Sequence, residues 1–289
     1  MTLVARLAET VAARVPHWDL VTAASRGKRL GRLAYRLDRR HRDTALSNLS
    51  RAYPGRDQAW YERTARASFE QMGRTALELL WSPRLTDYPM EQVIRPDDGM
   101  AHLERALTAG DGAILVSAHY GNWELVGVAL AKMGVPLVSI ARPLDDRRLD
   151  RLVTQLRSCT GARVLPKRNA FRPALRALRE GCALAILADQ NTLPPEAVFV
   201  PYFDRLAATT PAVAQFHLRS GAPILPVFGM PSGDHYRLAI DPPIETPAST
   251  HAEPVLKITT SITARIEHYV RACPEAWLWM HDRWRERPA

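Results

Sequence analysis

The chain has 289 residues, 46% of them hydrophobic, and its 39 Lys and Arg against 30 Asp and Glu residues give a net charge of +9. The length and apolar content allow one large core, and the positive charge favours anionic partners such as phospholipid surfaces, nucleic acid or acidic carrier proteins. Three widely spaced cysteines without a Cys-x-x-Cys motif argue against a disulfide framework and a zinc site. We therefore expect a single domain over residues 1–289, with the cysteine chemistry of a cytosolic protein.

Residues 1–80 are expected to be helical. Apolar residues recur at helical spacing from Leu3 to Val15, and a second periodic stretch covers residues 61–80. No apolar run approaches the ~20 residues that span a bilayer, and charged residues interrupt the first fifteen positions, unlike a signal peptide. Any membrane contact is therefore expected to be peripheral.

Eight basic residues crowd into residues 26–42, opposed only by Asp38. On one continuous helix, four of the arginines would share a face: Arg29, Arg32, Arg36 and Arg40. Three leucines would share another: Leu30, Leu33 and Leu37. This layout is typical of a helix lying on an anionic membrane, and the alternative is a solvated charged face. Nucleic-acid binding is disfavoured, because no recognised binding motif accompanies the charge.

From residue 113 onward, short apolar runs alternate with helical segments. The expected strands are 113–116, 137–140, 183–188, 198–202, 224–228 and 236–240. The expected helices are 125–133, 146–158, 171–180, 211–220 and 255–270. Such alternation indicates an α/β fold, with a largely parallel or mixed sheet flanked by helices. Residues 100–289 are thus expected to form an α/β catalytic core behind a helical, membrane-facing region of residues 1–80.

Polar side chains follow three of the expected strands. His119 follows 113–116, Arg142 follows 137–140, and Asp189 and Gln190 follow 183–188. In open α/β sheets, ligands bind at the carboxyl ends of the strands. These groups could therefore converge on one pocket, provided that the three strands are neighbours.

Residues 117–124 read Ser-Ala-His-Tyr-Gly-Asn-Trp-Glu at the junction of a strand and a helix. This junction places His119 on a loop, Asn122 at a helix N-cap and Glu124 in the first helical turn. A histidine that acts as a base needs a carboxylate on its far nitrogen, and a bent loop lets two residues five positions apart meet. The pattern predicts a dyad in which Glu124 orients His119. The alternative is a structural histidine at a strand end.

Three tryptophans and a basic residue occupy residues 277–284. We expect the Trp rings to pack under the sheet and Arg283 to pair with an acid, rather than a direct catalytic role. Elsewhere the chain has no Gly-x-Ser-x-Gly, phosphate-loop, Gly-x-Gly-x-x-Gly or His-Glu-x-x-His motif. Serine hydrolases, nucleotide kinases, dinucleotide enzymes and zinc proteases are therefore disfavoured.

Taken together, several motifs resemble the bacterial lipid A biosynthesis acyltransferase family, which includes phosphatidylinositol mannoside acyltransferases. They run through nearly the whole chain in order: Asn48-Leu49, Tyr53-Pro54, His119-Tyr-Gly-Asn-Trp-Glu124, Ala141-Arg142-Pro143, Leu156-Arg157-Ser158, Asp189-Gln190, Thr209-Thr210-Pro211 and Trp277-Leu-Trp-Met-His281-Asp-Arg-Trp284. The resemblance implies the glycerolipid acyltransferase type of α/β fold. It also implies transfer of a fatty acyl group from a carrier thioester to a lipid hydroxyl.

By this resemblance, His119 is the general base and Glu124 its orienting carboxylate, and no metal or other cofactor takes part. The substrate-binding positions implied are Asn122, Arg142, Arg157, Asp189 and Gln190. Arg157 could hold the phosphopantetheine of the donor or a lipid phosphate. The implied partners are acyl carrier protein or acyl-coenzyme A as the donor, a glycolipid acceptor and an anionic membrane surface, with no nucleic acid.

Two features depart from the family pattern. Many members carry a membrane-spanning N-terminal helix, whereas no such helix is expected within residues 1–289. Attachment is then expected to be peripheral, at the cytoplasmic face of the inner membrane. It would be made through residues 26–42 and the amphipathic N-terminal stretch from Leu3 to Val15. Asp282 stands where a basic residue is common, which affects the expected preference for phosphorylated head groups.

Other functions fit the same residues. With water or an amine as the acceptor, the dyad would make the protein a thioesterase or an N-acyltransferase. A non-enzymatic module that binds acidic lipid or nucleic acid would need only the basic surface.

Overall fold

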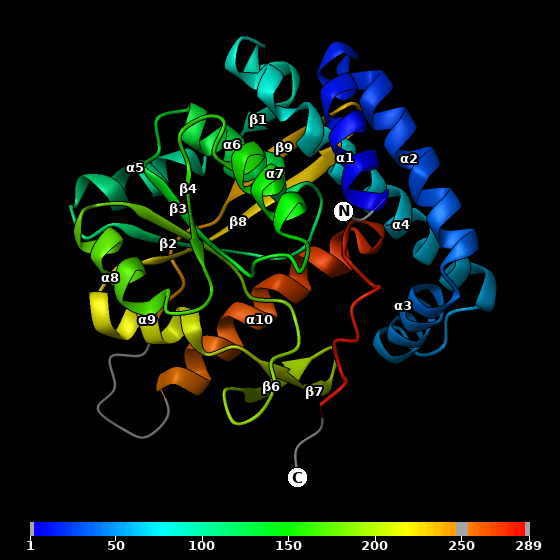
Figure 1. Ribbon diagram of the computed structural model, residues 1–289. Coiled ribbons are helices and arrows are strands. Elements are labelled where there is room, and N and C mark those ends of the chain that lie inside the picture. The colour runs from blue at the N-terminus through cyan, green and yellow to red at the C-terminus, as the bar shows by residue number, and fades with distance from the viewer. Residues whose placement is uncertain (1–2, 247–253, 287–289) are drawn as a thin grey trace.

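The computed structural model describes residues 3–246 and 254–286 (Figure 1). The chain begins with four helices, α1 (Leu3–Arg14), α2 (Leu20–Leu37), α3 (Arg39–Ala52) and α4 (Gln58–Trp81), which confirms the predicted helical N-terminal region. Asp19, Asp38 and Asp57 cap α2, α3 and α4, each by accepting a hydrogen bond from the backbone N–H three residues later. Such caps satisfy N–H groups that have no partner inside the helix.

The basic segment 26–42 is not one continuous helix, contrary to the expectation from its spacing. Helix α2 ends at Leu37, and Asp38 is both its C-cap and the N-cap of α3. The Asp38 carboxylate accepts the backbone N–H of His41 at 3.1 Å and contacts the His41 ring at 2.7 Å. Arg40 therefore begins a new helix and does not extend the arginine face of α2.

Helices α2 and α4 cross at a contact made by glycines. Gly27 and Gly31 of α2 are buried, and a Cβ atom on Gly27 would lie only 2.6 Å from the carbonyl oxygen of Gly73 in α4. A larger residue would force the two backbones apart. This contact turns the leucines of α2 away from the core: Leu30, Leu33 and Leu37 are 49%, 51% and 72% exposed.

Seven strands form one mixed sheet in the order β1-β9-β8-β2-β5-β3-β4. Their bounds are β1 (Ile94–Pro96), β2 (Ala113–Ser117), β3 (Leu137–Ala141), β4 (Arg163–Pro166), β5 (Ala183–Leu187), β8 (Ile224–Ser232) and β9 (His235–Ile240). Neighbouring strands are parallel except β8 and β9, which are antiparallel. The predicted mixed α/β sheet is thus confirmed.

One expected strand lies outside this sheet. β6 (Val198–Tyr202) pairs instead with β7 (Arg205–Thr209) as an antiparallel hairpin. Its two-residue turn places Phe203 and Asp204 at φ values of 51° and 58°. Positive φ at both central residues is the geometry of a tight hairpin turn, so the chain reverses here instead of crossing over to a parallel strand.

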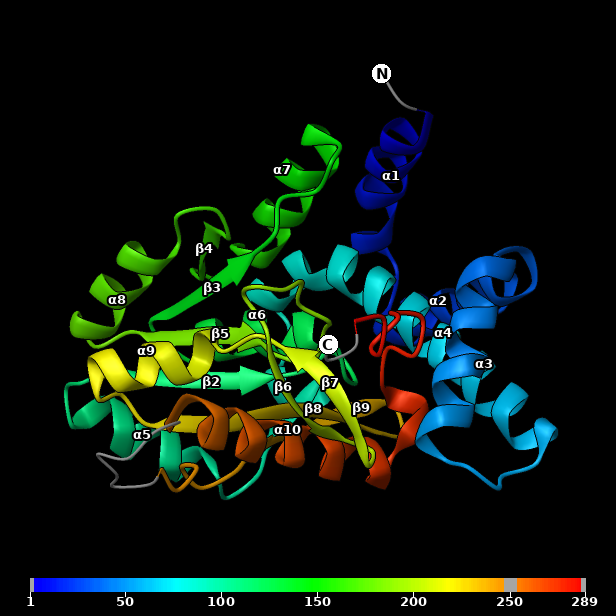
Figure 2. The same ribbon diagram turned by 90° about the horizontal axis from the view of Figure 1, so that it is seen from below.

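Helices cover both faces of the sheet (Figures 1 and 2). On one face, buried residues of α5 (Met100–Thr108) and α6 (Trp123–Lys132) pack with Ala113 and Leu115 of β2. On the other, α8 (Phe171–Arg179), α9 (Ala212–Ser220) and α10 (Pro254–Ala272) pack with Ile114 and Val116. The alternation follows from the two-residue period of a strand that is buried on both faces. Helix α7 (Arg147–Arg157) lies between β3 and β4 in the chain.

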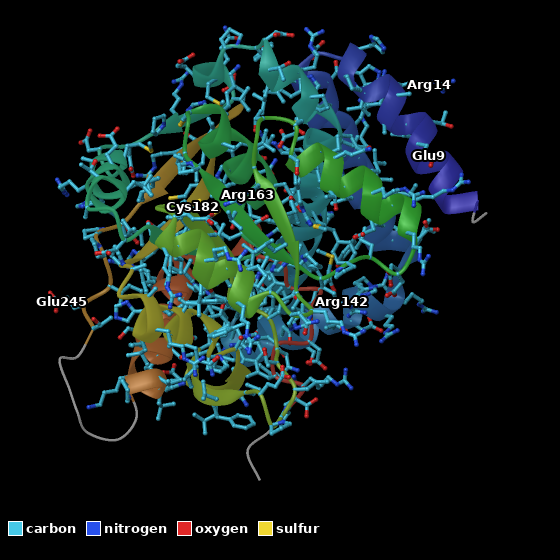
Figure 3. All side chains as sticks on the ribbon, turned by 60° about the vertical axis from the view of Figure 1, so that its left-hand side comes forward. Glu9, Arg14, Arg142, Arg163, Cys182 and Glu245 are labelled. Carbon is cyan, nitrogen blue, oxygen red and sulfur yellow. The ribbon has the colours of Figure 1, made fainter. Side chains whose placement is uncertain are left out.

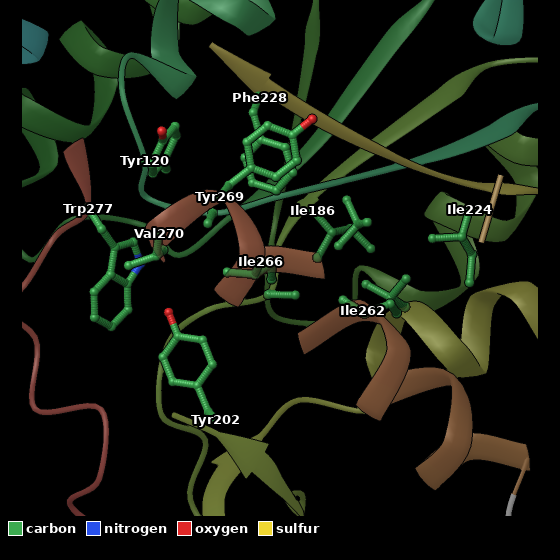
Figure 4. Packing of buried hydrophobic residues seen from close by; sticks show 14 of the residues in the cluster. Tyr120, Ile186, Tyr202, Ile224, Phe228, Ile262, Ile266, Tyr269, Val270 and Trp277 are labelled. Carbon is green, nitrogen blue, oxygen red and sulfur yellow. The ribbon is translucent and has the colours of Figure 1, made fainter. Parts of the chain in front are cut away.

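Helix α10 carries the C-terminal segment to the carboxyl end of the sheet. Tyr269 of α10 stacks on Phe228 of β8, with ring centroids 3.9 Å apart, and Ile262, Ile266 and Val270 lie in the same buried cluster (Figure 4). The short 3₁₀ turn Pro274–Ala276 then leads to Trp277. The expected burial of the tryptophans is observed, because Trp277, Trp279 and Trp284 are 1%, 0% and 7% exposed.

No helix in residues 3–246 and 254–286 combines the length and the apolar character needed to cross a membrane.

Candidate active site

The three strands that precede the predicted polar groups are neighbours in the sheet. β2 pairs with β5, and β5 pairs with β3, all in parallel. His119, Arg142 and Gln190 therefore follow the same edge of the sheet, and all three line one cavity of about 1210 Å³. Figure 3 shows Arg142 well apart from Arg163 and Cys182, which mark the opposite end of the strands.

Asp189 binds both the ring and the backbone of His119. Its Oδ1 lies 2.9 Å from Nδ1 of His119, and its Oδ2 accepts the backbone N–H of His119 at 2.9 Å. The carboxylate beside Nδ1 assigns the ring proton to that nitrogen. Nε2 of His119 is then the basic nitrogen, in a side chain that is 21% exposed and lines the cavity.

The environment of Asp189 keeps this carboxylate ionised. Burial by itself raises the pKa of Asp189, but the charge of His119 and hydrogen bonds from His119 and Trp277 lower it to about 2. The indole N–H of Trp277 donates to Oδ2 at 2.8 Å. Trp277 was expected only to fill the core, and the structure adds this contact with the His119–Asp189 pair. The high density of tryptophans in residues 277–284 was the feature of the sequence that drew attention to this segment.

The predicted contact between Glu124 and His119 is wrong in this structure. Both oxygens of Glu124 bind the guanidinium of Arg157, at 2.8 Å from Nε and 2.5 Å from Nη2. Arg157 is the last residue of α7 and reaches α6 across the cavity wall. A carboxylate held by both oxygens in this way is fixed on its arginine partner, whereas Asp189 occupies Nδ1 of His119.

Asn122 was expected to bind substrate, but it does not line the cavity. Its side chain is fully buried, its Oδ1 caps α6 by accepting the N–H of Leu125 at 3.0 Å, and its Nδ2 donates to Glu78 at 2.7 Å. Glu78 is itself buried in an ion pair with Arg74, at 2.7 Å. The N-cap assignment from the sequence is thus correct, and the role of Asn122 is to hold the start of α6.

The remaining predicted residues reach the cavity. Nε2 of Gln190 lies 3.4 Å from Nε2 of His119. Arg142 is 79% exposed at the side chain and lies 3.4 Å from Asp145. Asp282 also lines the cavity and lies 3.6 Å from Arg51.

Arg283 has no acidic partner among residues 3–246 and 254–286, which corrects the expectation from the sequence. Its guanidinium donates to the carbonyl oxygen of Ala208 at 2.6 Å and to Oγ1 of Thr209 at 2.5 Å, and it lies 5.3 Å from the ring centre of Tyr202. The residue is only 1% exposed. Arg283 therefore ties the C-terminal segment to β7, and burial lowers the pKa of its guanidinium.

Part of the cavity wall is apolar. The apolar residues that line this part come from β2, β3, β5, β8 and α6: Leu115, Leu137, Ala185, Val227, Val126, Val128 and Leu130. Gly127 adds no side chain here, and a Cβ atom at this position would lie 3.7 Å from Leu137. The cavity thus joins a polar mouth to an apolar interior.

No group of three or more His, Cys, Asp or Glu side chains is placed to hold a metal ion in the parts of the chain that the structure describes. Comparison with known proteins identifies the family. The sequence profile described as bacterial lipid A biosynthesis acyltransferase matches residues 14–286. The chain belongs to this family. Membership confirms the predicted family and the predicted class of enzyme, an acyltransferase.

Curated proteins of two names are similar to this chain, phosphatidylinositol mannoside acyltransferases and lipid A biosynthesis acyltransferases. A phosphatidylinositol mannoside acyltransferase of Mycolicibacterium smegmatis is 27% identical over 187 residues, which cover 63% of this chain and 60% of that protein. The phosphatidylinositol mannoside acyltransferase of Mycobacterium tuberculosis is 26% identical over 75% of this chain and 69% of its own length. A lipid A biosynthesis palmitoleoyltransferase of Escherichia coli is 27% identical over 272 residues, 91% of this chain and 84% of that protein.

Proposed function

We propose that this chain transfers a fatty acyl group from a carrier thioester to a hydroxyl of a glycolipid, with His119 as the general base and Asp189 as its orienting carboxylate. The observation that carries the proposal is the 2.9 Å contact between Nδ1 of His119 and Oδ1 of Asp189, at the edge of a cavity of about 1210 Å³ with an apolar interior. The carrier is acyl carrier protein or coenzyme A.

In this reaction, Nε2 of His119 takes the proton of the acceptor hydroxyl as its oxygen attacks the thioester carbonyl carbon. The Asp189 carboxylate stabilises the imidazolium that forms. When the C–S bond breaks, the imidazolium returns the proton to the departing sulfur. No acyl-enzyme forms. General base catalysis supplies ~10²–10⁴-fold of the rate, so positioning of the two substrates must supply much of the remainder.

The cavity suits two substrates. Its volume of about 1210 Å³ exceeds the ~300–1,000 Å³ of a usual small-molecule pocket, which leaves room for an acyl chain and part of an acceptor head group. The apolar part between α6 and the sheet would take the acyl chain. The hydroxyl and the thioester would then meet at the polar mouth, beside His119.

Arg157 was expected to hold the phosphopantetheine of the donor or a lipid phosphate, but its ion pair with Glu124 argues against this role. The Glu124 carboxylate already neutralises the guanidinium through two contacts. We assign Arg157 to a positioning role, because it joins α7 to α6 along the cavity wall. Arg142 and Lys167, which line the mouth and are exposed, are better placed for a phosphate of the donor or the acceptor.

The acceptor belongs to the glycolipid classes named for the relatives, a lipid A precursor or a phosphatidylinositol mannoside. Contact with the membrane would be made by α2. Leu30, Leu33 and Leu37 are exposed, and Arg29 and Arg36 on the same helix are exposed beside them. Exposed leucines flanked by arginines would insert at the surface of an anionic bilayer, at its cytoplasmic face.

A product assay tests this function. Purified protein is given isotope-labelled palmitoyl-coenzyme A or palmitoyl acyl carrier protein, with vesicles that contain extracted bacterial glycolipids or with plain phospholipid vesicles. We expect labelled ester on the glycolipid, with one of the two donors. Labelled free acid in equal yield with both vesicles would make the protein a thioesterase, and a labelled amide would make it an N-acyltransferase.

A further inference from the structure

Three consecutive residues at the end of β5 hold two histidines of the same cavity. Asp189 binds Nδ1 of His119, and Nε2 of Gln190 lies 3.4 Å from Nε2 of His119. The next backbone N–H, that of Asn191, donates to Nε2 of His281 at 2.9 Å. His119 and His281 both line the cavity, and they come from loops 162 positions apart in the chain.

The two rings have opposite tautomers. His119 donates from Nδ1 to a carboxylate, so its Nε2 carries the lone pair. His281 accepts a backbone N–H at Nε2, so the proton of its neutral ring is on Nδ1. Among the residues that the structure describes, none is bonded to that Nδ1–H. One histidine is therefore set up to accept a proton, and the other to donate a hydrogen bond.

His281 is also held neutral and in place. Burial lowers the pKa of His281, and the nearby His119 and Arg283 lower it further, against the opposing effect of Asp189 and Asp282. Protonation would also put a hydrogen on Nε2, where it would meet the N–H of Asn191. The backbone is fixed, because Nδ2 of the buried Asn48 donates to the carbonyl oxygen of His281 at 2.6 Å.

We propose that His281 is a second catalytic residue of this site, whose Nδ1–H binds the thioester carbonyl oxygen as it becomes an oxyanion. This inference rests on the acyl transfer proposed above. A fixed neutral donor is effective in this role, because it needs no reorganisation when the negative charge develops. A histidine that stays neutral also does not compete with His119 for the proton of the hydroxyl.

The step balances with these two groups. The acceptor hydroxyl loses its proton to Nε2 of His119 and forms a C–O bond to the thioester carbon, while the carbonyl π electrons move to oxygen. The oxyanion accepts a hydrogen bond from Nδ1–H of His281, which keeps its proton. As the carbonyl re-forms, the C–S bond breaks, and the thiolate takes the proton from His119. Ester and free thiol are the products, and both histidines are restored.

The test compares two ligands on wild type, His281→Ala and His281→Phe, neither of which has a hydrogen-bond donor in its side chain. One ligand is a trifluoromethyl ketone analogue of acyl pantetheine, which mimics the oxyanion, and the other is the matching alkyl pantetheine thioether, which has no carbonyl. Pantetheine is common to both carriers. We expect the variants to bind the ketone at least 30-fold more weakly and the thioether within threefold of wild type. The kcat of acyl transfer should fall ~10²–10³-fold with KM nearly unchanged.

The controls separate this inference from the proposed function. His268→Ala changes an exposed histidine of α10 that does not line the cavity, and should leave kcat and both affinities unchanged. The role of His281 would be overturned if a variant lost affinity for both ligands equally, or if a folded variant kept kcat within threefold of wild type. Acyl transfer by wild type would stand in either case. Wild type that makes no acylated lipid would instead overturn the proposed function. If both substitutions unfold the protein, the Nδ1–H tautomer is tested by the ¹⁵N shifts of wild-type His281, and an Nε2–H tautomer would contradict the proposal.

Discussion

Asp189 contacts His119 with both carboxylate oxygens, Oδ1 at 2.9 Å from the ring Nδ1 and Oδ2 at 2.9 Å from the backbone nitrogen. The same Oδ2 accepts the indole N–H of Trp277 at 2.8 Å. One buried carboxylate therefore fixes the tautomer of the ring and the backbone that carries it. This geometry makes Asp189, rather than Glu124, the partner on which the proposed activity of His119 depends.

Replacing Asp189 by Asn should abolish most of the acyl transfer. An amide can present N–H to Nδ1, which would favour the tautomer with the proton on Nε2 and remove the basic lone pair. We expect kcat to fall by ~10²–10⁴-fold with little change in KM. The measurement is steady-state acyl transfer by folded Asp189→Asn. Activity within threefold of wild type would show that the pair is structural.

Asp189→Asn should lower the free energy of unfolding by less at low pH than at neutral pH. The pKa of Asp189 is about 2 in the folded protein and 3.8 in an unfolded chain. Because the folded pKa is the lower one, the ionised carboxylate stabilises the fold at pH values above 3.8, and this contribution is lost as the pH falls toward 2. The shift corresponds to about 2 kcal/mol at neutral pH.

Urea unfolding of wild type and Asp189→Asn at pH 6 and at pH 3 measures this effect. The gap in free energy of unfolding between the two proteins should narrow at the lower pH. The exposed aspartates of the helix caps titrate in both proteins and cancel in the comparison. An unchanged gap between pH 6 and pH 3 would contradict the assigned pKa shift.

Glu124 and Arg157 should behave as one unit. Glu124→Gln frees the guanidinium, Arg157→Gln leaves a half-buried carboxylate without its partner, and the double variant loses both groups together. We expect each single variant to lose ~10-fold or more in kcat/KM. The kcat/KM of the double variant should be no lower than that of the less active single variant. Additive losses in a double-mutant cycle would mean that the two residues act separately on the substrates.

Membrane contact through α2 is tested by replacing its exposed leucines. Leu30→Ser, Leu33→Ser and Leu37→Ser together should weaken co-sedimentation with anionic phospholipid vesicles at least tenfold, because each leucine loses buried apolar area in the bilayer interface. Leu206→Ser with Leu218→Ser is the matched control, since both leucines are exposed outside α2. Equal vesicle binding by the two variants would place the membrane contact elsewhere.

The sequence predicts the central strands well and the edge strands poorly. β2, β3 and β5 are buried on both faces, so each reads as an apolar run. β4 has exposed residues at both ends, β1 has three residues, and β7 begins with an exposed Arg205 and Leu206. Such short or solvated strands form because a neighbour offers hydrogen bonds, and their own residues carry little signal.

The partner of His119 could not be found from local spacing. Ser117 of β2 lies opposite Leu187 of β5, so the residues two positions further on, His119 and Asp189, meet beyond the strand ends. That register depends on β2 and β5 being neighbours, although 70 residues separate them in the chain. Local spacing predicts Glu124 instead, but the partner of Glu124 is Arg157, at the end of α7.

The C-terminal segment shows the same limit. Its tryptophans are buried as predicted, but the contacts of Trp277 with Asp189 and of Arg283 with β7 join segments about 70 to 90 residues apart. A buried arginine needs hydrogen-bond acceptors, and carbonyl and hydroxyl oxygens serve here in place of an acid.

The most direct test of the account is mass spectrometry of lipids after wild type and His119→Ala have been incubated with an acyl thioester pool and a bacterial lipid extract. His268→Ala and a thermal melt of each protein control for folding. We predict an acylated glycolipid with wild type and His268→Ala, reduced at least 100-fold with His119→Ala. Equal amounts of this product from wild type and folded His119→Ala would contradict the central claim that His119 is the base of an acyl transfer reaction.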